Sequence, residues 1–336
     1  MKIVFLTKYY SPNVGGVEKH VCKLTQELKN RGHSVTVVTS QILPQIQPTQ
    51  NSKQTILRIP YQYLDNKIAT WKWIIEHKQL FSQANIIHIH DVFWWYLPLR
   101  FIFPYKPIYT TFHGWEGIYP PARKAIVWRK LAEKLSRGNI CVGYFISHWY
   151  KTKPNLVTYG ATDQKALPLN PKNNLRILVL GRLSPDNDIE VVVTALKQLK
   201  MVIPNIKVAF VGDGPLGIKA SQVGKVLGFK SDVTFYLKNH NWVITSSYLS
   251  IADSLAANRY VFSTFSNPLK KDYLTGHPCS EFFSINSSSD ELFASIKSAV
   301  QKPTSTEKKL RLAHQWTTKQ TWKKLTDQYL KLWGIK

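Results

Sequence analysis

Three residues of this chain could hold a phosphate group. Gly15 and Gly16 stand directly before a helix pattern at 17–30. The backbone N–H groups of a helix's first turn are free to bind an anion, and glycine lets a phosphate approach them closely. Arg182 follows an apolar strand pattern at 176–180, where its guanidinium can form charge-assisted hydrogen bonds with a phosphate. Glycine turns are common in α/β proteins, and a solvated surface arginine is the alternative for Arg182.

A histidine and a glutamate follow another strand pattern. His113 and Glu116 come just after the apolar run 107–112. Ligands of parallel sheets bind at the carboxyl ends of the strands, so both are candidate site residues, and a purely structural histidine is the alternative for His113. His88 and His90 alternate along a further strand pattern, so they point to one face of the sheet. For these two we prefer packing on the sheet to catalysis.

Two sets of strand patterns must position these residues. A buried parallel strand is a continuous apolar run because helices cover both of its faces. One such run opens the chain at 2–7, and a second set begins at 175–180, roughly half the chain away. The pattern predicts an α/β protein of two doubly wound, Rossmann-like domains that face a central cleft. In the second set we expect strands that include 206–211 and 232–236.

Prolines and paired asparagines mark the junction between the two sets. They place a linker at 166–174, where Pro168 and Pro171 stand. The last helix pattern carries an apolar stripe suited to packing. The predicted organisation is an N-terminal Rossmann-like domain at 1–165, a C-terminal Rossmann-like domain at 175–315, and a C-terminal helix at 316–336 that packs across the domain junction.

The composition points to an anionic partner. Across 336 residues, 45 Lys and Arg face 20 Asp and Glu, a net charge of +25. Nucleic acid, an anionic membrane and a phosphorylated small molecule all fit this charge, and a generally lysine-rich composition is the alternative. No nucleic-acid-binding motif is present, so we expect no nucleic-acid partner. Neither GxGxxG nor a P-loop occurs, which argues against a dinucleotide dehydrogenase and a P-loop NTPase.

The cysteines and the first residues predict the compartment. The three cysteines are widely spaced and form neither a disulfide framework nor a CxxC pair. No His, Cys and Asp cluster has metal-ligand spacing, so we predict no metal. The chain enters a strand pattern at once, from which we expect no signal peptide, and no apolar run is long enough to cross a membrane. We therefore expect a cytoplasmic protein.

Several ordered segments resemble the retaining GT-B glycosyltransferases of the family that includes bacterial phosphatidylinositol mannosyltransferases (glycosyltransferase family 4, group 1 type). Thr111-Phe112-His113-Gly114-Trp115-Glu116 resembles the HGxD/E segment, and Gly181-Arg182-Leu183-Ser184-Pro185 resembles the opening of the second domain. Each motif is loose, but their order and spacing together are specific. The other similar segments are 10–21, 86–90, 159–163, 211–216 and 248–255.

The resemblance implies an enzyme and a mechanism. It implies a hexosyltransferase that moves a sugar from a nucleotide-diphosphate donor to a lipid-linked, saccharide or other hydroxyl acceptor, with retention of configuration, in cell-surface glycan or glycolipid synthesis. The developing charge on the leaving diphosphate is stabilised by cations and N–H groups, so neither a cofactor nor a metal is expected. The implied roles are donor binding by Gly15, Gly16, Arg182 and Asp253, sugar positioning by His113, and acceptor-side contacts by Glu18 and Glu116.

The chain departs from the family's pattern in the donor site. Asn187 stands where a lysine is usual, Thr245 replaces the first glutamate of the E-x7-E signature, and Asp253 is one methylene shorter than the second. Lys270 or Lys271 could supply the missing cation, and Lys270 is our candidate. These departures support one alternative, a catalytically inactive GT-B protein that binds or acts as a scaffold.

A basic helix predicts a membrane contact. Residues 122–137 alternate basic and apolar side chains around one tryptophan. Basic amphipathic helices of this kind lie on anionic lipid surfaces, and a basic helix does so in the related lipid mannosyltransferases. An ordinary helix with its apolar side on the core is the alternative. If this helix binds a membrane, we expect the protein to associate peripherally with the inner face of the plasma membrane. The basic residues are Arg123, Lys124, Arg129, Lys130, Lys134 and Arg137.

Overall fold

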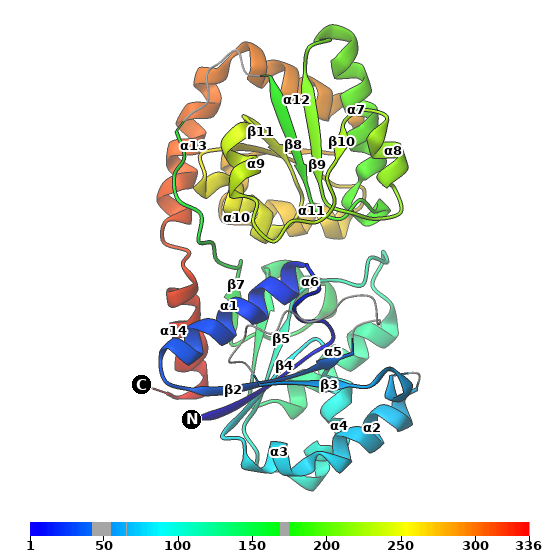
Figure 1. Ribbon diagram of the computed structural model, residues 1–336, viewed down its shortest axis with the longest axis vertical. Helices are drawn as coiled ribbons and strands as arrows, with labels where there is room; N and C mark the ends of the chain where they lie inside the picture. Colours follow the sequence, from blue (N-terminus) through cyan, green and yellow to red (C-terminus); the bar gives the residue numbers. More distant parts are fainter. Residues whose placement is uncertain (42–54, 65, 169–174, 336) are drawn as a thin grey trace. The chain divides into compact units, whose positions relative to one another are not determined.

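A computed structural model describes residues 1–41, 55–64, 66–168 and 175–335. The described chain packs into two compact units, one made of 1–158 with 322–335 and the other of 159–321. Each unit is built around one parallel sheet (Figure 1). The two doubly wound α/β units predicted from the sequence are confirmed. Most of the predicted linker, 169–174, lies outside the described residues.

The first unit holds a seven-stranded sheet in the order β3-β2-β1-β4-β5-β6-β7. Every pair of neighbours is parallel, and β4 and β5 are buried along their whole length. The strands are β1 (Lys2–Thr7), β2 (Ser34–Ser40), β3 (Thr55–Ile59), β4 (Ile86–His90), β5 (Ile108–Phe112), β6 (Gly138–Val142) and β7 (Leu156–Thr158).

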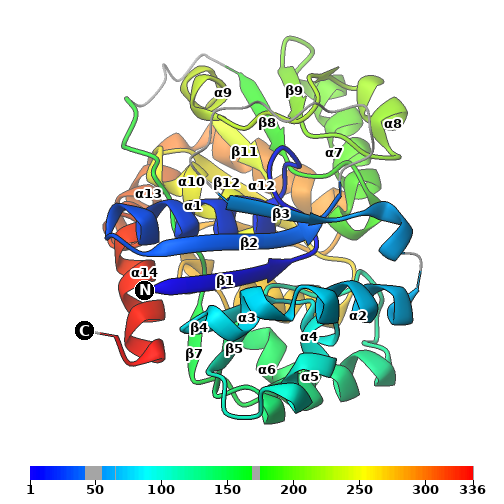
Figure 2. The same cartoon turned by 60° about the horizontal axis from the view of Figure 1, so that its bottom comes forward.

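Helices cover both faces of this sheet. α1 packs beside α14, and α2, α3 and α4 lie on the face opposite α1 (Figure 2). Covered on both faces, the strands can bury continuous apolar runs, as their sequences require. The helices are α1 (Gly16–Asn30), α2 (Lys67–Glu76), α3 (Lys78–Gln83), α4 (Phe93–Ile102), α5 (Arg123–Leu135), α6 (Tyr144–Tyr150) and α14 (Trp322–Trp333), with a 3-10 turn at Tyr61–Tyr63.

The second unit holds a six-stranded sheet in the order β10-β9-β8-β11-β12-β13, again parallel throughout. Its strands are β8 (Arg176–Leu180), β9 (Lys207–Val211), β10 (Lys225–Val226), β11 (Trp242–Ile244), β12 (Tyr260–Thr264) and β13 (Ser284–Asn286). Its helices are α7 (Ile189–Val202), α8 (Gly217–Ser221), α9 (Thr234–Asn239), α10 (Tyr248–Ala256), α11 (Pro268–Thr275), α12 (Ser289–Gln301) and α13 (Pro303–Thr317), with 3-10 turns at Pro185–Asn187 and Ser280–Phe282.

One predicted strand of the second unit is wrong. Residues 232–236 were expected to extend because of their β-branched and aromatic side chains, but α9 begins at Thr234. Asp232 accounts for the difference, since its carboxylate accepts hydrogen bonds from the Thr234 backbone N–H at 2.9 Å and hydroxyl at 2.6 Å. These local side-chain hydrogen bonds just before the helix outweigh the weak strand preference of this short segment.

The boundary between the units also differs from the expected one. The segment from 159 belongs to the second unit rather than to a domain ending at 165. It is tied there by side chains: Thr162 donates to Asp253 at 2.6 Å, and Asn258 donates to the Leu167 carbonyl at 3.1 Å. Arg259, 1% exposed, donates to the Pro168 carbonyl at 3.0 Å.

The C-terminal helix was expected to start near 316 and to pack across the junction. Instead α13 ends at Thr317, and α14 packs on α1 within the first unit. The apolar stripe of α14 explains its place, because Tyr329 and Trp333 are buried against the first sheet, where Trp333 donates to His88 at 3.1 Å. No helix within the described ranges is both long and apolar enough to cross a bilayer.

Candidate functional site

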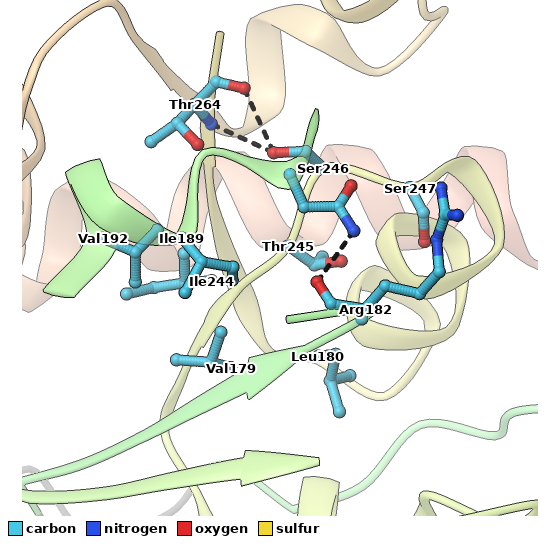
Figure 3. A pocket seen from close by; sticks show the side chains of 12 residues that line it. Val179, Leu180, Arg182, Ile189, Val192, Ile244, Thr245, Ser246, Ser247 and Thr264 are labelled. Atoms are coloured by element: carbon cyan, nitrogen blue, oxygen red, sulfur yellow. Dashed lines mark hydrogen bonds between the residues drawn. The ribbon is translucent and has the colours of Figure 1, made fainter. Parts of the chain in front are cut away.

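The carboxyl ends of β8, β11 and β12 enclose a small pocket in the second unit. Arg182 and Ser247 lie on one side of it and Val179 and Val192 on the other, with Thr245 between them (Figure 3). Ligands bind at this edge of parallel sheets. The pocket is lined by Val179, Leu180, Gly181, Arg182, Asn187, Ile189, Val192, Ile244, Thr245, Ser246, Ser247 and Thr264.

Two glycines shape the turn that carries Arg182. Gly181 has a φ of +133°, which side chains rarely allow. A β-carbon on Gly212, at the end of the neighbouring strand, would collide with the Gly181 carbonyl oxygen. Asn187 closes the turn by donating to the Arg182 carbonyl at 2.9 Å. The position where the family usually has a lysine therefore serves the backbone of the arginine turn.

Arg182 and Lys270 meet at Asp186. The Arg182 guanidinium donates to the Asp186 carboxylate at 2.7 Å, with 65% of the arginine side chain exposed. Lys270 Nζ donates to the Asp186 backbone carbonyl at 3.4 Å, and Ser184 donates to the carboxylate at 2.5 Å. The structure thus brings together the arginine and the candidate lysine, although 88 positions of sequence numbering separate Arg182 from Lys270.

Lys270 is held in a buried position. It is 4% exposed, stands in the first turn of α11 and lies over the Tyr273 ring at 5.1 Å, whereas the neighbouring Lys271 is exposed. Burial lowers the pKa of Lys270, and the carboxylates of Asp188 and Asp186 oppose this effect. A cation in such a place gains most from an added anion, because little water screens the interaction.

The two positions of the E-x7-E signature have different surroundings. Thr245, 4% exposed, lines the pocket, and its buried hydroxyl has no hydrogen-bond partner in the described part of the chain. An unpartnered buried hydroxyl is costly, so it can readily bond to a ligand. Asp253 is buried in α10, and one carboxylate oxygen accepts from Thr162. That bond ties Asp253 to the segment which enters the second unit.

His113 stands at the carboxyl end of β5, as predicted. Its backbone N–H donates to Asp91 at 3.0 Å, and its Nε2 lies 2.8 Å from Nδ1 of His90. The ring of His20, from α1, stands edge-on to it with centroids 4.7 Å apart. Sequence reasoning placed His90 in the sheet and did not single out His20, since nothing in the sequence shows which helix covers β4.

Four histidines form one buried group in the first unit: His20, His88, His90 and His113. Burial lowers the pKa of each well below 6.5, to about 3 for His113, where Arg129 adds to the effect. Desolvation disfavours the charged imidazolium, so all four are neutral at physiological pH. His88 and His90 pack on one face of the sheet, as predicted, beside Phe5.

Glu116 is tied to two helices. One carboxylate oxygen accepts from Arg129 at 2.9 Å, and the other accepts from the Tyr150 hydroxyl. Arg129 also donates to the Gly114 carbonyl and lies 3.8 Å from the centroid of the Tyr150 ring. These contacts hold the loop that follows His113. The sequence interpretation missed that Arg129 holds this loop.

The prediction for the basic helix α5 is therefore wrong for one of its residues. Arg129 was expected on its exposed basic surface, but it is buried on the same side as Ala132. The spacing of three residues between Arg129 and Ala132 was the available signal, because such positions share a helix face. The remaining basic residues of the set are exposed: Arg123, Lys124, Lys130, Lys134 and Arg137.

The Gly15-Gly16 turn carries a carboxylate of its own. α1 begins at Gly16, and Glu18 lies in its first turn. The Glu18 carboxylate is placed so close that a β-carbon on Gly15 would collide with it. A negative charge is stabilised at a helix N-terminus, so Glu18 occupies the place that the sequence assigns to a phosphate.

Comparisons with known proteins agree with these features. Residues 14–153 match the model of Glycosyltransferase Family 4. Sucrose-phosphate synthase from Thermosynechococcus elongatus has the same fold, with a TM-score of 0.78, 15% identity, and coverage of 99% of this chain and 98% of that one. No curated protein sequence matched.

Two further solved structures share the fold. Anabaena HepE in complex with UDP and glucose has a TM-score of 0.73 and 15% identity, and the match covers 98% of this chain and 99% of that one. WaaG, a glycosyltransferase involved in lipopolysaccharide biosynthesis, has a TM-score of 0.61 and 12% identity, and the match covers 97% and 98%. At such identities the likeness concerns the fold.

Proposed function

We propose that the chain is a GT-B glycosyltransferase of the family 4 type, because residues 14–153 match that family's model and the whole chain shares the fold of a sucrose-phosphate synthase. We propose further that it transfers a hexose from a nucleotide-diphosphate sugar to a hydroxyl acceptor with retention of configuration. HepE was solved with UDP and glucose, which makes UDP-sugars the first donors to test. We propose a lipid-linked or saccharide acceptor, and a place in cell-surface glycan or glycolipid synthesis.

The meeting of Arg182 and Lys270 at Asp186 supports this proposal most directly. Sugar transfer leaves a nucleoside diphosphate, whose developing negative charge must be stabilised in the transition state. A guanidinium and a buried ammonium at the carboxyl edge of the second sheet supply that charge from the protein. The Asp186 carboxylate keeps Arg182 in place until the diphosphate takes over its hydrogen bonds. We propose that the reaction needs neither a metal nor a cofactor.

We assign the other predicted residues as follows. His113 positions the transferring sugar, and Asp253 and Thr245 contact the donor in the second unit. Glu116 acts through the loop that it holds, because both of its carboxylate oxygens are already hydrogen-bonded within the first unit. Gly15 and Gly16 contact phosphate only after the Glu18 carboxylate moves aside, so Glu18 responds to substrate on the acceptor side.

A binding experiment tests the donor site. Wild-type protein should gain thermal stability with UDP or a UDP-sugar, because a ligand that binds only the folded state stabilises it. Lys270→Ala should remove most of this gain, and the matched control Lys271→Ala should keep it. Equal behaviour of the two lysine variants would contradict the assignment of Lys270.

An activity experiment tests the reaction. The protein is given a hydroxyl acceptor and a UDP-sugar that stabilised it in the binding experiment. NMR of the product should show the same anomeric configuration as in the donor. A metal chelator should leave the transfer rate unchanged. Inverted product or chelator sensitivity would contradict retention or metal independence, respectively. Nucleotide binding with neither transfer nor donor hydrolysis would favour the alternative, an inactive binding protein. The hydrogen bond from Thr162 to Asp253 also supports this alternative, because it occupies a carboxylate oxygen proposed to contact the donor.

We also propose that α5 attaches the protein to the cytoplasmic face of an anionic membrane. Its four exposed basic residues flank Val127, which is 65% exposed, and Ile118 just upstream is 61% exposed. Each basic residue near such a surface contributes about 1 kcal/mol. Reversing the charges of Arg123, Lys124, Lys130 and Lys134 should abolish binding to phosphatidylserine vesicles at moderate salt.

The second unit provides a matched control for that experiment. Lys207, Lys225, Lys230 and Lys238 are equally exposed, and changing all four to glutamate removes the same net charge. This variant should keep most of the vesicle binding. If both sets weaken binding alike, general basicity rather than α5 is responsible.

A further inference from the structure

His90 contacts the ring of His113 directly. We propose that His90 is a positioning residue that keeps the proton of His113 on Nδ1 and so makes His113 a hydrogen-bond donor rather than a general base. The tautomer is a property of the protein alone, whereas the consequence for a substrate rests on the proposed function. The two side chains come from the carboxyl ends of neighbouring parallel strands, β4 and β5.

The first step is the number of protons between the rings. Nδ1 of His90 and Nε2 of His113 are 2.8 Å apart, which is a hydrogen-bond distance. Both imidazoles are neutral because burial lowers their pKa values. A neutral imidazole has one N–H donor and one bare acceptor nitrogen. One of the two facing nitrogens therefore carries a proton, and the other accepts it as a hydrogen bond.

The second step is the direction of this bond. His90 is 1% exposed, and its remaining nitrogen, Nε2, is buried without a partner in the described part of the chain. Buried N–H groups without an acceptor are rarer in proteins than buried acceptors without a donor. The proton of His90 therefore lies on Nδ1 and is donated to Nε2 of His113. His113 then carries its own proton on Nδ1.

The third step is the packing that keeps both rings in place. The Trp333 indole can only donate, so His88 accepts at Nδ1 over 3.1 Å and donates from Nε2 to the Thr111 hydroxyl over 2.7 Å. That hydroxyl bonds to the Tyr329 hydroxyl at 3.0 Å, which bonds to Nε2 of His20 at 2.9 Å. Both ring nitrogens of His88 are therefore hydrogen-bonded, and the ring of His20 is held edge-on against that of His113.

The consequence is chemical. Nε2 of His113 is occupied by the hydrogen bond from His90, so the ring has no free lone pair with which to remove a proton. Nδ1 makes no hydrogen bond to the described chain and offers an N–H group. Such a group binds an oxygen acceptor, which in the proposed reaction is a hydroxyl or ring oxygen of the sugar.

The test is the nitrogen NMR spectrum of the full-length protein. In 15N-labelled wild type, His113, assigned by its loss in His113→Gln, should show a protonated Nδ1 and a bare Nε2 at pH 7.5. His90→Leu removes the donor, so the His113 tautomer should shift toward Nε2–H. His90→Asn keeps an N–H near the Nδ1 position and should restore the wild-type pattern. The exposed His148 is the internal control.

The outcomes separate the inference from the proposed function. A protonated Nε2 on His113 in wild type overturns the inference, even if His90→Leu fails to fold, and so does a tautomer unchanged in a folded His90→Leu. With a UDP-sugar and a hydroxyl acceptor, kcat/KM should fall about 10- to 100-fold in His90→Leu and recover in His90→Asn. A correct tautomer without any transfer leaves the inference standing and refutes the proposed function.

Discussion

The two units carry polar side chains at the same edge of the same kind of sheet, yet the electrostatics of these edges are opposite. In the first unit the group consists of four neutral histidines. His90 is hydrogen-bonded to His113, while His88 is hydrogen-bonded to Thr111 and to an aromatic residue of α14, and His20 to another aromatic residue of α14. In the second unit it consists of charges, with Arg182 and Lys270 around Asp186.

The difference follows from what covers each edge. α14 brings aromatic side chains onto β4, and burial keeps the four histidines of this group uncharged by lowering their pKa values. In the second unit the side chain of Arg182 remains 65% exposed. The first edge is therefore suited to neutral, hydroxyl-rich ligands and the second to anions. Four experiments test this contrast, beginning with the largest expected effect.

Acid should unfold the first unit before the second. Each of the four buried histidines has a lowered pKa, so below about pH 6.5 the unfolded chain takes up protons that the folded chain cannot. Stability is thus complete above pH 6.5 and falls toward pH 3, by up to about 1.4 kcal/mol per pH unit for each histidine. Among the described residues of the second unit, burial lowers the pKa of two histidines, to about 3 for His277 and in the same direction for His240.

Urea unfolding at pH 7.5 and pH 5.5, followed by tryptophan fluorescence, measures this loss, because all tryptophans except Trp242 and Trp316 lie in the first unit. His20→Gln replaces one histidine with a neutral donor and should reduce the acid sensitivity, while His148→Gln, at an exposed position, should not. If hydrogen exchange shows both units opening together as the pH falls, the contrast is wrong.

Arg182→Ala should lower turnover by about 10²- to 10³-fold, the cost of losing one stabilising donor at a developing charge. It should also weaken UDP binding, since the anion site lies in the second unit. His113→Gln should lower turnover but leave UDP affinity unchanged, because a neutral residue of the first unit does not hold the diphosphate. Calorimetric titration with UDP measures both affinities. An equal loss of UDP affinity in the two variants would contradict the assignment of the diphosphate to the second unit alone.

Arg129→Met should destabilise the first unit by about 2 kcal/mol, because it removes the donor to the Gly114 carbonyl and to one carboxylate oxygen of Glu116. The matched control is Lys124→Met on the exposed side of the same helix, for which we expect a change within about 0.5 kcal/mol. Urea unfolding compares the two. Similar values for both would mean that the contacts of Arg129 with Glu116 and Gly114 do not stabilise the loop after His113.

Tyr329→Phe should have the smallest effect, about 1 kcal/mol, from the loss of hydrogen bonds to His20 and Thr111 with little change in packing. Tyr105→Phe is the control, since Tyr105 is 96% exposed. Besides stability, the NMR spectrum of His20 should change in Tyr329→Phe alone. An unchanged His20 signal would show that α14 does not order the histidines.

Local patterns allowed part of the site to be predicted. His113, Arg182 and the glycine turn were recognised because each follows an apolar strand run, and the ends of parallel strands meet at one edge. Arg129 and His20 were missed because their contacts are with other elements of the fold, Arg129 with the loop after His113 and His20 with α14. The basic residues around Arg129 look alike in the sequence, and only burial separates the one that packs inward.

By itself, the sequence determined the two parallel sheets and the strand ends that carry the site, because apolar runs of strand length leave a chain few ways to bury them. The tertiary structure alone decided which lysine joins Arg182, which arginine holds the loop after His113, and where the last helix packs. Those choices depend on distances between segments far apart along the chain, and charge state follows burial, which no local pattern of residues specifies.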